Sequence, residues 1–214
     1  SMKFWVYLLT SLMLTIGVVF VTVLMTSMCG YAIARLSFAG KALVVGLLIV
    51  GTVAPQEAII IPIFRMLNAA NLLDGLWGMV LWISGVGITN TFLMAGFFYS
   101  LPKEVEEAAK VDGAGTFRTF FDIAFPMARP IVATVALFAF LGAWNQFLIP
   151  LICSASRDEL QPLAVAVALF REGRTGNWQL FNAAAAVMII PAIILFIFVQ
   201  RYIVKSIAVG AVKG

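Results

Sequence analysis

Long uncharged runs of apolar residues, separated by short charged segments, set the hydropathy pattern of this chain. A helix needs about 20 apolar residues to cross the hydrocarbon core of a bilayer, and helices are expected there because no water reaches the backbone polar groups. Stretches of suitable length cover roughly residues 6–33, 42–64, 76–99, 131–153 and 180–199. The pattern therefore predicts an all-α fold, a polytopic transmembrane helical bundle with five spans in a single domain, residues 1–214.

The composition favours the same fold class. Hydrophobic residues make up 63% of the chain and charged residues 11%, whereas soluble domains are about half apolar and about a quarter charged. The net charge of +4 is too small to indicate a nucleic-acid partner, and we expect membrane lipid around the chain instead.

The distribution of Lys and Arg predicts the orientation of the spans. Nine of these residues fall in segments 35–41, 101–130 and 201–214, and five fall on the opposite side. Positive charge favours the cytoplasmic side, so we expect the loop 101–130 and the C-terminal tail 201–214 inside the cell. The N-terminus then lies outside without a secretory leader, because the uncharged run after Lys3 is too long for one. We therefore expect a further span upstream, giving six in the intact protein.

The external segment 154–179 contains an apolar stretch that is too short to span a bilayer. This stretch, residues 160–170, is predicted to be a re-entrant or reclining helix packed at a channel mouth, or alternatively an ordinary amphiphilic helix in a loop. Residues 171–176 are rich in glycine and charge, which indicates an exposed flexible turn.

The loop 101–130 is predicted to contain two short helices joined by a glycine turn. Pro102 suits the first turn of a helix, and Gly113 can take the left-handed conformation after that helix stops at Asp112. Thr116 is placed to cap the second helix. Apolar residues at helical spacing should form one face on each helix, namely Val105, Ala108 and Ala109 on the first and Phe117, Phe120, Phe121 and Ala124 on the second. Such a loop can dock into a cleft on a partner, or it can be a solvated segment that only sets the topology.

The spacing of several residues in this loop is more specific than its helical pattern. The residues Glu107, Ala108, Ala109, Gly113, Ile123 and Pro126 form a pattern that resembles the EAA loop of binding-protein-dependent ABC importer permeases. The residues between them, Asp112, Ala114 and Phe120, resemble the carbohydrate-uptake, maltose-type branch of that family. Further segments agree in order with this branch, namely YAIARLSFAGK, AWNQFLIPL and QRYIVKSIAVGAVKG.

The C-terminal GAVKG resembles the second of the two channel subunits in that branch. Two departures stand out. Phe125 replaces the usual Leu, and the family's first span and the large external loop after it have no counterpart here.

The resemblance implies a permease subunit that moves a sugar or a related polyol or glycerol-phosphate solute inward. It implies that Glu107 pairs with a basic residue of a separate ATPase, that Gly113 supplies the bend between two coupling helices, and that Asp112 caps or braces this bend. The implied partners are a second permease in a heterodimer, an ATPase dimer and an extracytoplasmic solute-binding protein. The implied location is the plasma (inner) membrane of a bacterium or archaeon. The tail 201–214 is either a frayed terminus or a segment that reaches the ATPase.

The chain is not expected to be an enzyme or to bind a cofactor or metal. It contains no histidine, the usual general base and commonest metal ligand. It also lacks the GxxxxGK[ST] pattern that cradles nucleotide phosphates, so ATP and Mg²⁺ are expected on the partner. A self-sufficient secondary transporter or channel is the alternative, but it needs ion-coupling carboxylates, and Glu57 is the one acidic residue within a predicted span.

Polar residues within the predicted spans are candidates for a solute path. Glu57 is costly to bury unpaired, so it is a path ligand, a partner for the other channel subunit, or a group near the outer interface. Trp144, Asn145 and Gln146 combine an aromatic face with amides, which suits a sugar. These amides, like Asn90 in the preceding span, could equally form hydrogen bonds between helices.

Overall fold

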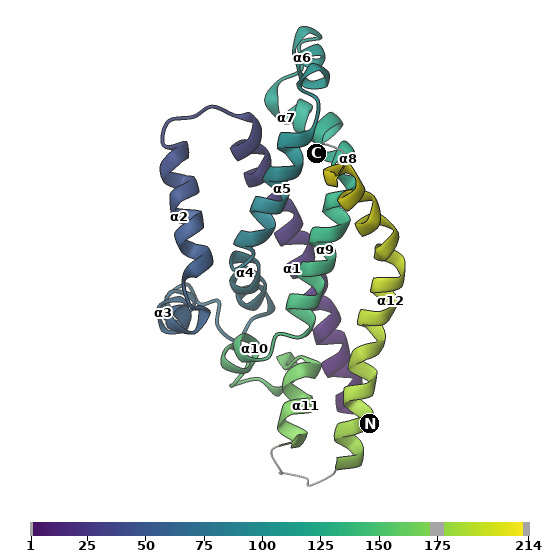
Figure 1. Cartoon of the computed structure of the whole chain (residues 1–214). Coiled ribbons are helices and arrows are strands. Elements are labelled where there is room, and N and C mark those ends of the chain that lie inside the picture. The colour runs from purple at the N-terminus through teal and green to yellow at the C-terminus, as the bar shows by residue number, and fades with distance from the viewer. Residues whose placement is uncertain (1, 172–177, 212–214) are drawn as a thin grey trace. The chain divides into compact units, whose positions relative to one another are not determined.

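The computed structural model of the chain describes residues 2–171 and 178–211 and is helical almost throughout (Figure 1). The described residues contain no strand, which confirms the all-α class. The helices longer than four residues are α1 (Met2–Arg35), α2 (Lys41–Val53), α3 (Ile60–Ala69), α4 (Leu76–Gly85), α5 (Ile88–Ser100), α6 (Lys103–Val111), the π-helical segment η2 (Phe120–Ala124), α9 (Arg129–Trp144), α10 (Leu148–Cys153), α11 (Leu163–Arg171) and α12 (Trp178–Ala211). The short helical turns are η1 (Gln56–Ile59), α7 (Thr116–Thr119), α8 (Phe125–Met127) and η3 (Asp158–Leu160).

The chain divides into two compact units, and the longest helices contribute to both. The first unit comprises Ser1–Thr22, Pro55–Val86 and Leu137–Phe198, and the second comprises Val23–Ala54, Gly87–Ala136 and Val199–Gly214.

The five predicted spans are not confirmed as five continuous helices. In the described residues, Phe4–Arg35 and Phe181–Phe198 are long and apolar enough to cross a membrane alone. Two bent pairs, α4 with α5 and α7–α8 with α9, would each add one span if counted together. The predicted span 42–64 is interrupted, because α2 ends at Val53, two residues before Pro55. Proline has no backbone N–H to donate, and its ring clashes with the preceding turn of an α-helix. The predicted spans 76–99 and 131–153 are likewise broken, between α4 and α5 and between α9 and α10.

The first unit has its core where α1, α4 and α10 meet. The most deeply buried members are Leu14, Met79, Val80 and Cys153. Close approach of α1 to α4 depends on Gly17, since a Cβ there would lie 3.0 Å from a methyl of Val80. Absence of a side chain at a helix interface lets two backbones approach closely.

The predicted apolar segment 160–170 overlaps helix α11 (Leu163–Arg171), which packs against α1 and α12. Leu163 and Val167 lie in a cluster with Ala184 of α12 and with Phe4, Tyr7 and Leu8 of α1. The Leu163 amide donates a hydrogen bond of 2.7 Å to the Ser11 hydroxyl, which fixes the start of the helix. The helix is confirmed, whereas its re-entrant character stays a prediction. The predicted flexible turn falls largely outside the described residues.

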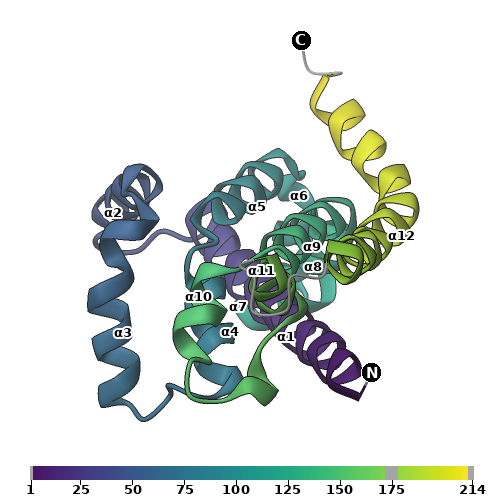
Figure 2. The same cartoon turned by 90° about the horizontal axis from the view of Figure 1, so that it is seen from below.

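The second unit has its core between the C-terminal part of α1, α5, η2 and the N-terminal part of α9. Its buried members include Tyr31, Met94, Phe98, Phe120 and Val135. Figure 2 shows α5 and α9 next to each other in this unit, with α2 at the outer side of α5. Helix α2 has no buried residue, so its apolar surface needs lipid or a partner to cover it.

Candidate functional site

Helix α6 is well specified by its own sequence. Pro102 occupies the N-cap position, Glu104 and Glu106 lie in the first turn and Lys110 lies in the last. This charge distribution complements the helix dipole. The helix ends as predicted, with Gly113 at φ 79°. Its two closing hydrogen bonds, Gly113 N–H to the Lys110 carbonyl at 3.0 Å and Ala114 N–H to the Ala109 carbonyl at 2.9 Å, form a Schellman motif.

The second part of the loop differs from the prediction in two respects. The N-cap of α7 is Gly115, with no side-chain capping bond, so the predicted cap at Thr116 is wrong. The four residues of the predicted apolar stripe differ in burial, and they form two pairs whose members are each one helical turn apart. Phe120 and Ala124 are buried in the core of the second unit, whereas Phe117 and Phe121 are 71% and 47% exposed. The Phe121 ring still contacts the ring of Phe120, and the exposed surface of this pair is available to a partner.

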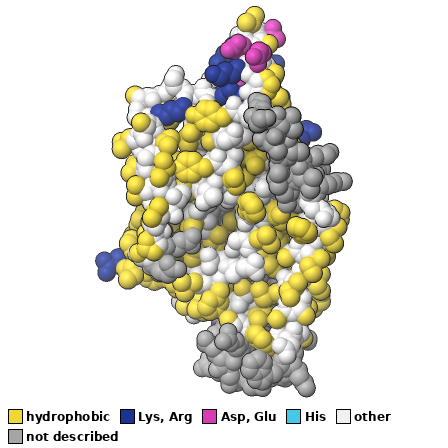
Figure 3. Space-filling model, viewed as in Figure 1, with side chains coloured by type: hydrophobic (Ala, Val, Ile, Leu, Met, Phe, Trp, Pro, Cys, Tyr) yellow, Lys and Arg dark blue, Asp and Glu magenta, His cyan; other side chains and the backbone are white. Residues whose placement is uncertain are grey.

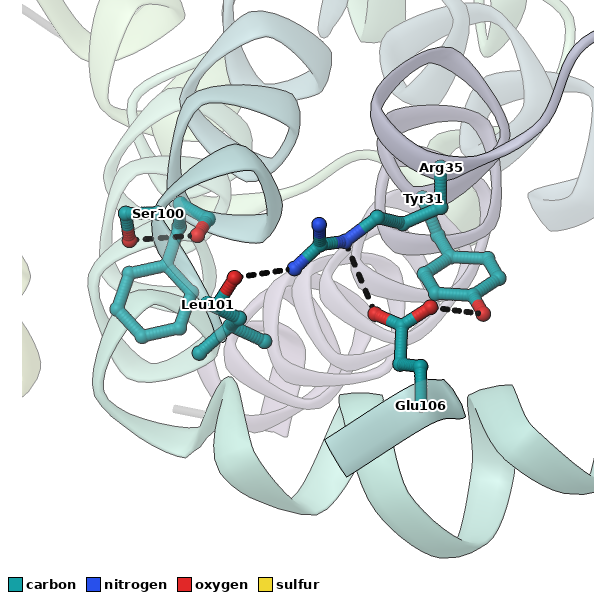
Figure 4. Close-up of polar contacts among 6 residues, drawn as sticks. Tyr31, Arg35, Ser100, Leu101 and Glu106 are labelled. Carbon is teal, nitrogen blue, oxygen red and sulfur yellow. Dashed lines mark hydrogen bonds and ion pairs between the residues drawn. The ribbon is translucent and has the colours of Figure 1, made fainter. Parts of the chain in front are cut away.

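A buried ion pair joins the loop 101–130 to the end of α1 (Figure 4). Arg35 Nε lies 2.9 Å from Glu106 Oε1, and the two side chains are 4% and 9% exposed. This contact has ion-pair distance without hydrogen-bond alignment. The Tyr31 hydroxyl donates to the other carboxylate oxygen at 3.1 Å, and Arg35 Nη2 donates to the Leu101 carbonyl at 2.6 Å. The cluster thus connects α1, the end of α5 and α6.

No pattern in the sequence predicted this cluster. The resemblance drew attention to Glu107, which is exposed and makes no ion pair within the described part of the chain. The residue before it, Glu106, is buried instead. The sequence does contain one sign of the cluster. Tyr31 and Arg35 are four residues apart and therefore lie on the same face of a helix.

The outer surface of the loop combines apolar and charged side chains around a shallow groove. The groove has a volume of about 330 Å³ and is lined by Val105, Ala108, Ala109, Asp112, Ala114, Arg118, Asp122 and Ile123. Beside it, Val111 is 87% exposed. Figure 3 shows acidic side chains gathered over the α6 end of the visible face, next to basic ones. An apolar patch rimmed by charge is typical of a protein-binding surface.

The residues of the EAA-like pattern lie in different surroundings in the structure. Ala108, Asp112, Ala114 and Ile123 line the groove together with the buried Ala109. Glu107 and Gly113 are exposed beside it, and Pro126 is half-buried. Phe120 packs inward and contacts the ring of Tyr31 with centroids 5.1 Å apart, so it supports the surface without forming part of it.

The predicted solute-path residues do not form one pocket. The indole of Trp144 is buried, donates to the Met188 carbonyl at 2.9 Å and stacks on Phe140, so it has a packing role. Asn145 donates to the Leu141 carbonyl at 2.8 Å. Gln146 accepts from the Phe147 amide and also lines a cavity of about 170 Å³ with Trp82 and Ile149.

The other two path residues add no contact to that cavity. Asn90 is half-buried in the first turn of α5 and belongs to the second unit. Glu57 lies in the 3₁₀ turn Gln56–Ile59, and its side chain is outside what the structure describes.

Comparison with known proteins identifies similar chains over nearly the whole length. A family model described as binding-protein-dependent transport system inner membrane component matches residues 4–209. A diacetylchitobiose uptake system permease from Streptomyces coelicolor is 33% identical over 97% of this chain and 69% of its own length. An arabinooligosaccharides transport system permease from Halalkalibacterium halodurans is 32% identical over 99% and 75%. A chain of a bacterial ABC transporter that imports the polysaccharide alginate shares the fold, with a TM-score of 0.85, 22% identity and coverage of 95% and 76%.

Proposed function

The chain belongs to the family of binding-protein-dependent transport system inner membrane components, and from this premise we propose that it forms half of the channel of an ABC importer for a sugar. Oligosaccharides are the favoured class, because the two relatives named above carry diacetylchitobiose and arabinooligosaccharides in their names. Polyols and glycerol-phosphate derivatives are the other candidates.

The energy for transport comes from a separate ATPase dimer in this proposal. The whole sequence contains no GxxxxGK[ST] pattern, so ATP and Mg²⁺ are assigned to that partner. The observation that carries the proposal is the surface formed by α6, α7 and η2. It presents Glu107, Val111 and Phe117 to solvent, while Phe120 and Ala124 anchor it in the core of the second unit. An exposed contact surface on a fixed base suits a segment that receives a force from another chain.

The remaining partners are a second permease and an extracytoplasmic solute-binding protein. In this arrangement α6 faces the cytoplasm, as the Lys and Arg distribution favours, and the C-terminus lies on the same side. The unburied helix α2 offers an apolar surface for lipid or for the second permease. The location is the inner membrane of a bacterium or archaeon.

The proposal is tested by reconstituting the chain with these partners in lipid vesicles and measuring uptake of labelled oligosaccharides. We expect uptake that needs ATP on the α6 side and the binding protein on the other side. Vesicles that contain the chain alone and an ion gradient provide the control. Concentrative uptake in this control, without ATP, would support a secondary transporter and contradict the proposal.

A further inference from the structure

The cluster of Tyr31, Arg35 and Glu106 lies outside the surface that the proposed coupling role uses. Its carboxylate is buried, whereas the neighbouring Glu107 is exposed. A buried ion pair is weak evidence for a stabilising role, because an apolar pair of similar volume is often equally stable. Charged and hydrogen-bonded groups do provide a defined geometry, which the non-directional hydrophobic contact lacks. The geometry of this cluster therefore needs an explanation other than stability.

We propose that these three residues form a rigid joint, the α1–α6 joint, which makes the coupling helix and the first span move as one body. They are positioning residues, since none of them lies on the exposed coupling surface. The proposal rests on the proposed function, because it describes how a force received by α6 reaches a span.

Arg35 contacts both α6 and the end of α5. Its Nε contacts Glu106 on α6, and its Nη2 donates to the carbonyl of Leu101, where α5 ends. The last carbonyls of a helix have no partner within the helix, so this bond satisfies a group that would otherwise be free. A guanidinium is planar and rigid, so one side chain fixes two elements in a defined geometry. The link between α5 and α6, Leu101 and Pro102, is therefore braced by the end of α1.

Helix α6 contacts α7 and η2, and its two buried residues are Glu106 and Ala109. Of these two, Glu106 contacts α1, through Tyr31 and Arg35. Tyr31 extends the joint to the rest of the loop, since its ring contacts Phe98 of α5 and Phe120 of η2 with centroids 5.5 and 5.1 Å apart.

Removal of the ion pair should leave α6 attached through its chain links to α5 and α7 and through its contacts with α7 and η2. A force on α6 would then move α1 less than it does while Arg35 and Glu106 are paired. Because α1 is one continuous helix from Met2 to Arg35, the intact joint instead transmits a displacement at its C-terminal end along its length.

The test measures solute transported per ATP hydrolysed by the complete importer in vesicles. Two variants separate geometry from stability. Glu106→Gln keeps the shape and removes the charge, and the double variant Arg35→Met with Glu106→Met replaces the pair by apolar side chains. Glu104→Gln, on the exposed side of the same helix, is the matched control. We expect both joint variants to assemble and hydrolyse ATP while transport per ATP falls about tenfold, within the usual range for coupling between sites, and we expect the control to be unchanged.

Two outcomes would overturn the joint. One is wild-type transport per ATP in both joint variants. The other is a loss of uptake that follows the loss of assembled complex, with the ratio per complex unchanged, which would leave only a folding role. The wild-type vesicles report separately on the proposed function, because they must show ATP-dependent uptake before any variant is compared. Tyr31→Phe removes one hydrogen bond and should lower the ratio less than Glu106→Gln.

Discussion

At the residue scale, Gly30 shows how closely α1 and α5 approach. A Cβ at this position would lie 2.7 Å from Met94 Cβ and 2.9 Å from the Ala95 backbone nitrogen. Backbone atoms of a packed helix cannot move aside cheaply, and overpacking of this kind costs about 1–3 kcal/mol.

We therefore expect Gly30→Ala to lower the thermal stability of the purified chain in detergent. Gly96→Ala is the control, because a Cβ there meets no atom within 4 Å and alanine favours the helix. Equal melting temperatures for Gly30→Ala and the parent chain would show that the two helices do not pack as described.

Glu107 provides the second prediction at this scale. Its exposed carboxylate is proposed to pair with a basic residue of the ATPase, and a hydrogen bond to a charged group contributes about 1.5–3 kcal/mol. Glu107→Ala should therefore weaken ATPase binding by roughly tenfold or more while insertion into the membrane is unchanged. Co-purification at graded ATPase concentrations measures this effect, with Glu104→Ala as the control. Unchanged binding would remove Glu107 from the coupling surface.

Individual residues mark the limit of what the sequence predicts. Gly113 was predicted correctly, because a glycine after a helix stop has a local conformational cause. The sequence could not show that Glu106 is buried while Glu104 and Glu107 are exposed, because all three lie in one short helix. Burial of Glu106 depends on the end of α1, which lies far away in the sequence, and no local pattern reports such a contact.

At the scale of elements, the turn between α6 and α7 depends on one backbone conformation. Gly113 has φ 79°, where an L-residue with a Cβ costs about 1–2 kcal/mol. Gly115, two residues later, has φ −71° where it caps α7. A Cβ meets no atom within 4 Å at either position, so the pair isolates the backbone effect.

Gly113→Ala should lower both stability and transport, whereas Gly115→Ala should change them little. Gly113→Pro should be more severe and uncouple transport from hydrolysis, since proline fixes φ near −65° and removes the N–H that bonds to Lys110. Thermal unfolding and uptake per ATP measure the two effects. Similar results for the two alanine variants would mean that the left-handed turn is not needed.

Element boundaries were predicted less well than element type. The apolar composition indicates helices, but it does not show where a span is interrupted. Pro55 indicates the end of α2 in the sequence, whereas the break after α4 follows Gly85 and has no proline to mark it. Such breaks depend on tertiary packing, which hydropathy does not contain.

At the scale of the whole molecule, the fold class and family were accessible from the sequence because hydropathy and the spacing of the loop extend over the whole chain. The solute path was not, because three of the residues proposed for it, Trp144, Asn145 and Gln146, have ordinary hydrogen-bond partners close by in the described chain. Trp144 and Asn145 both donate to backbone carbonyls. Their role in transport stays a prediction that depends on the partner subunit.

The proposal that the surface formed by α6, α7 and η2 binds the ATPase is tested most directly by cross-linking from Val111. This residue has the most exposed apolar side chain of that surface. Val111→Cys, in a chain whose Cys29 and Cys153 are replaced by serine, is treated with a short thiol-reactive photo-cross-linker in membranes that contain the ATPase. We expect a covalent product of the two chains that disappears when the ATPase is omitted. Labelling of this cysteine by a membrane-impermeant thiol reagent from outside the cell, with no product, would contradict it.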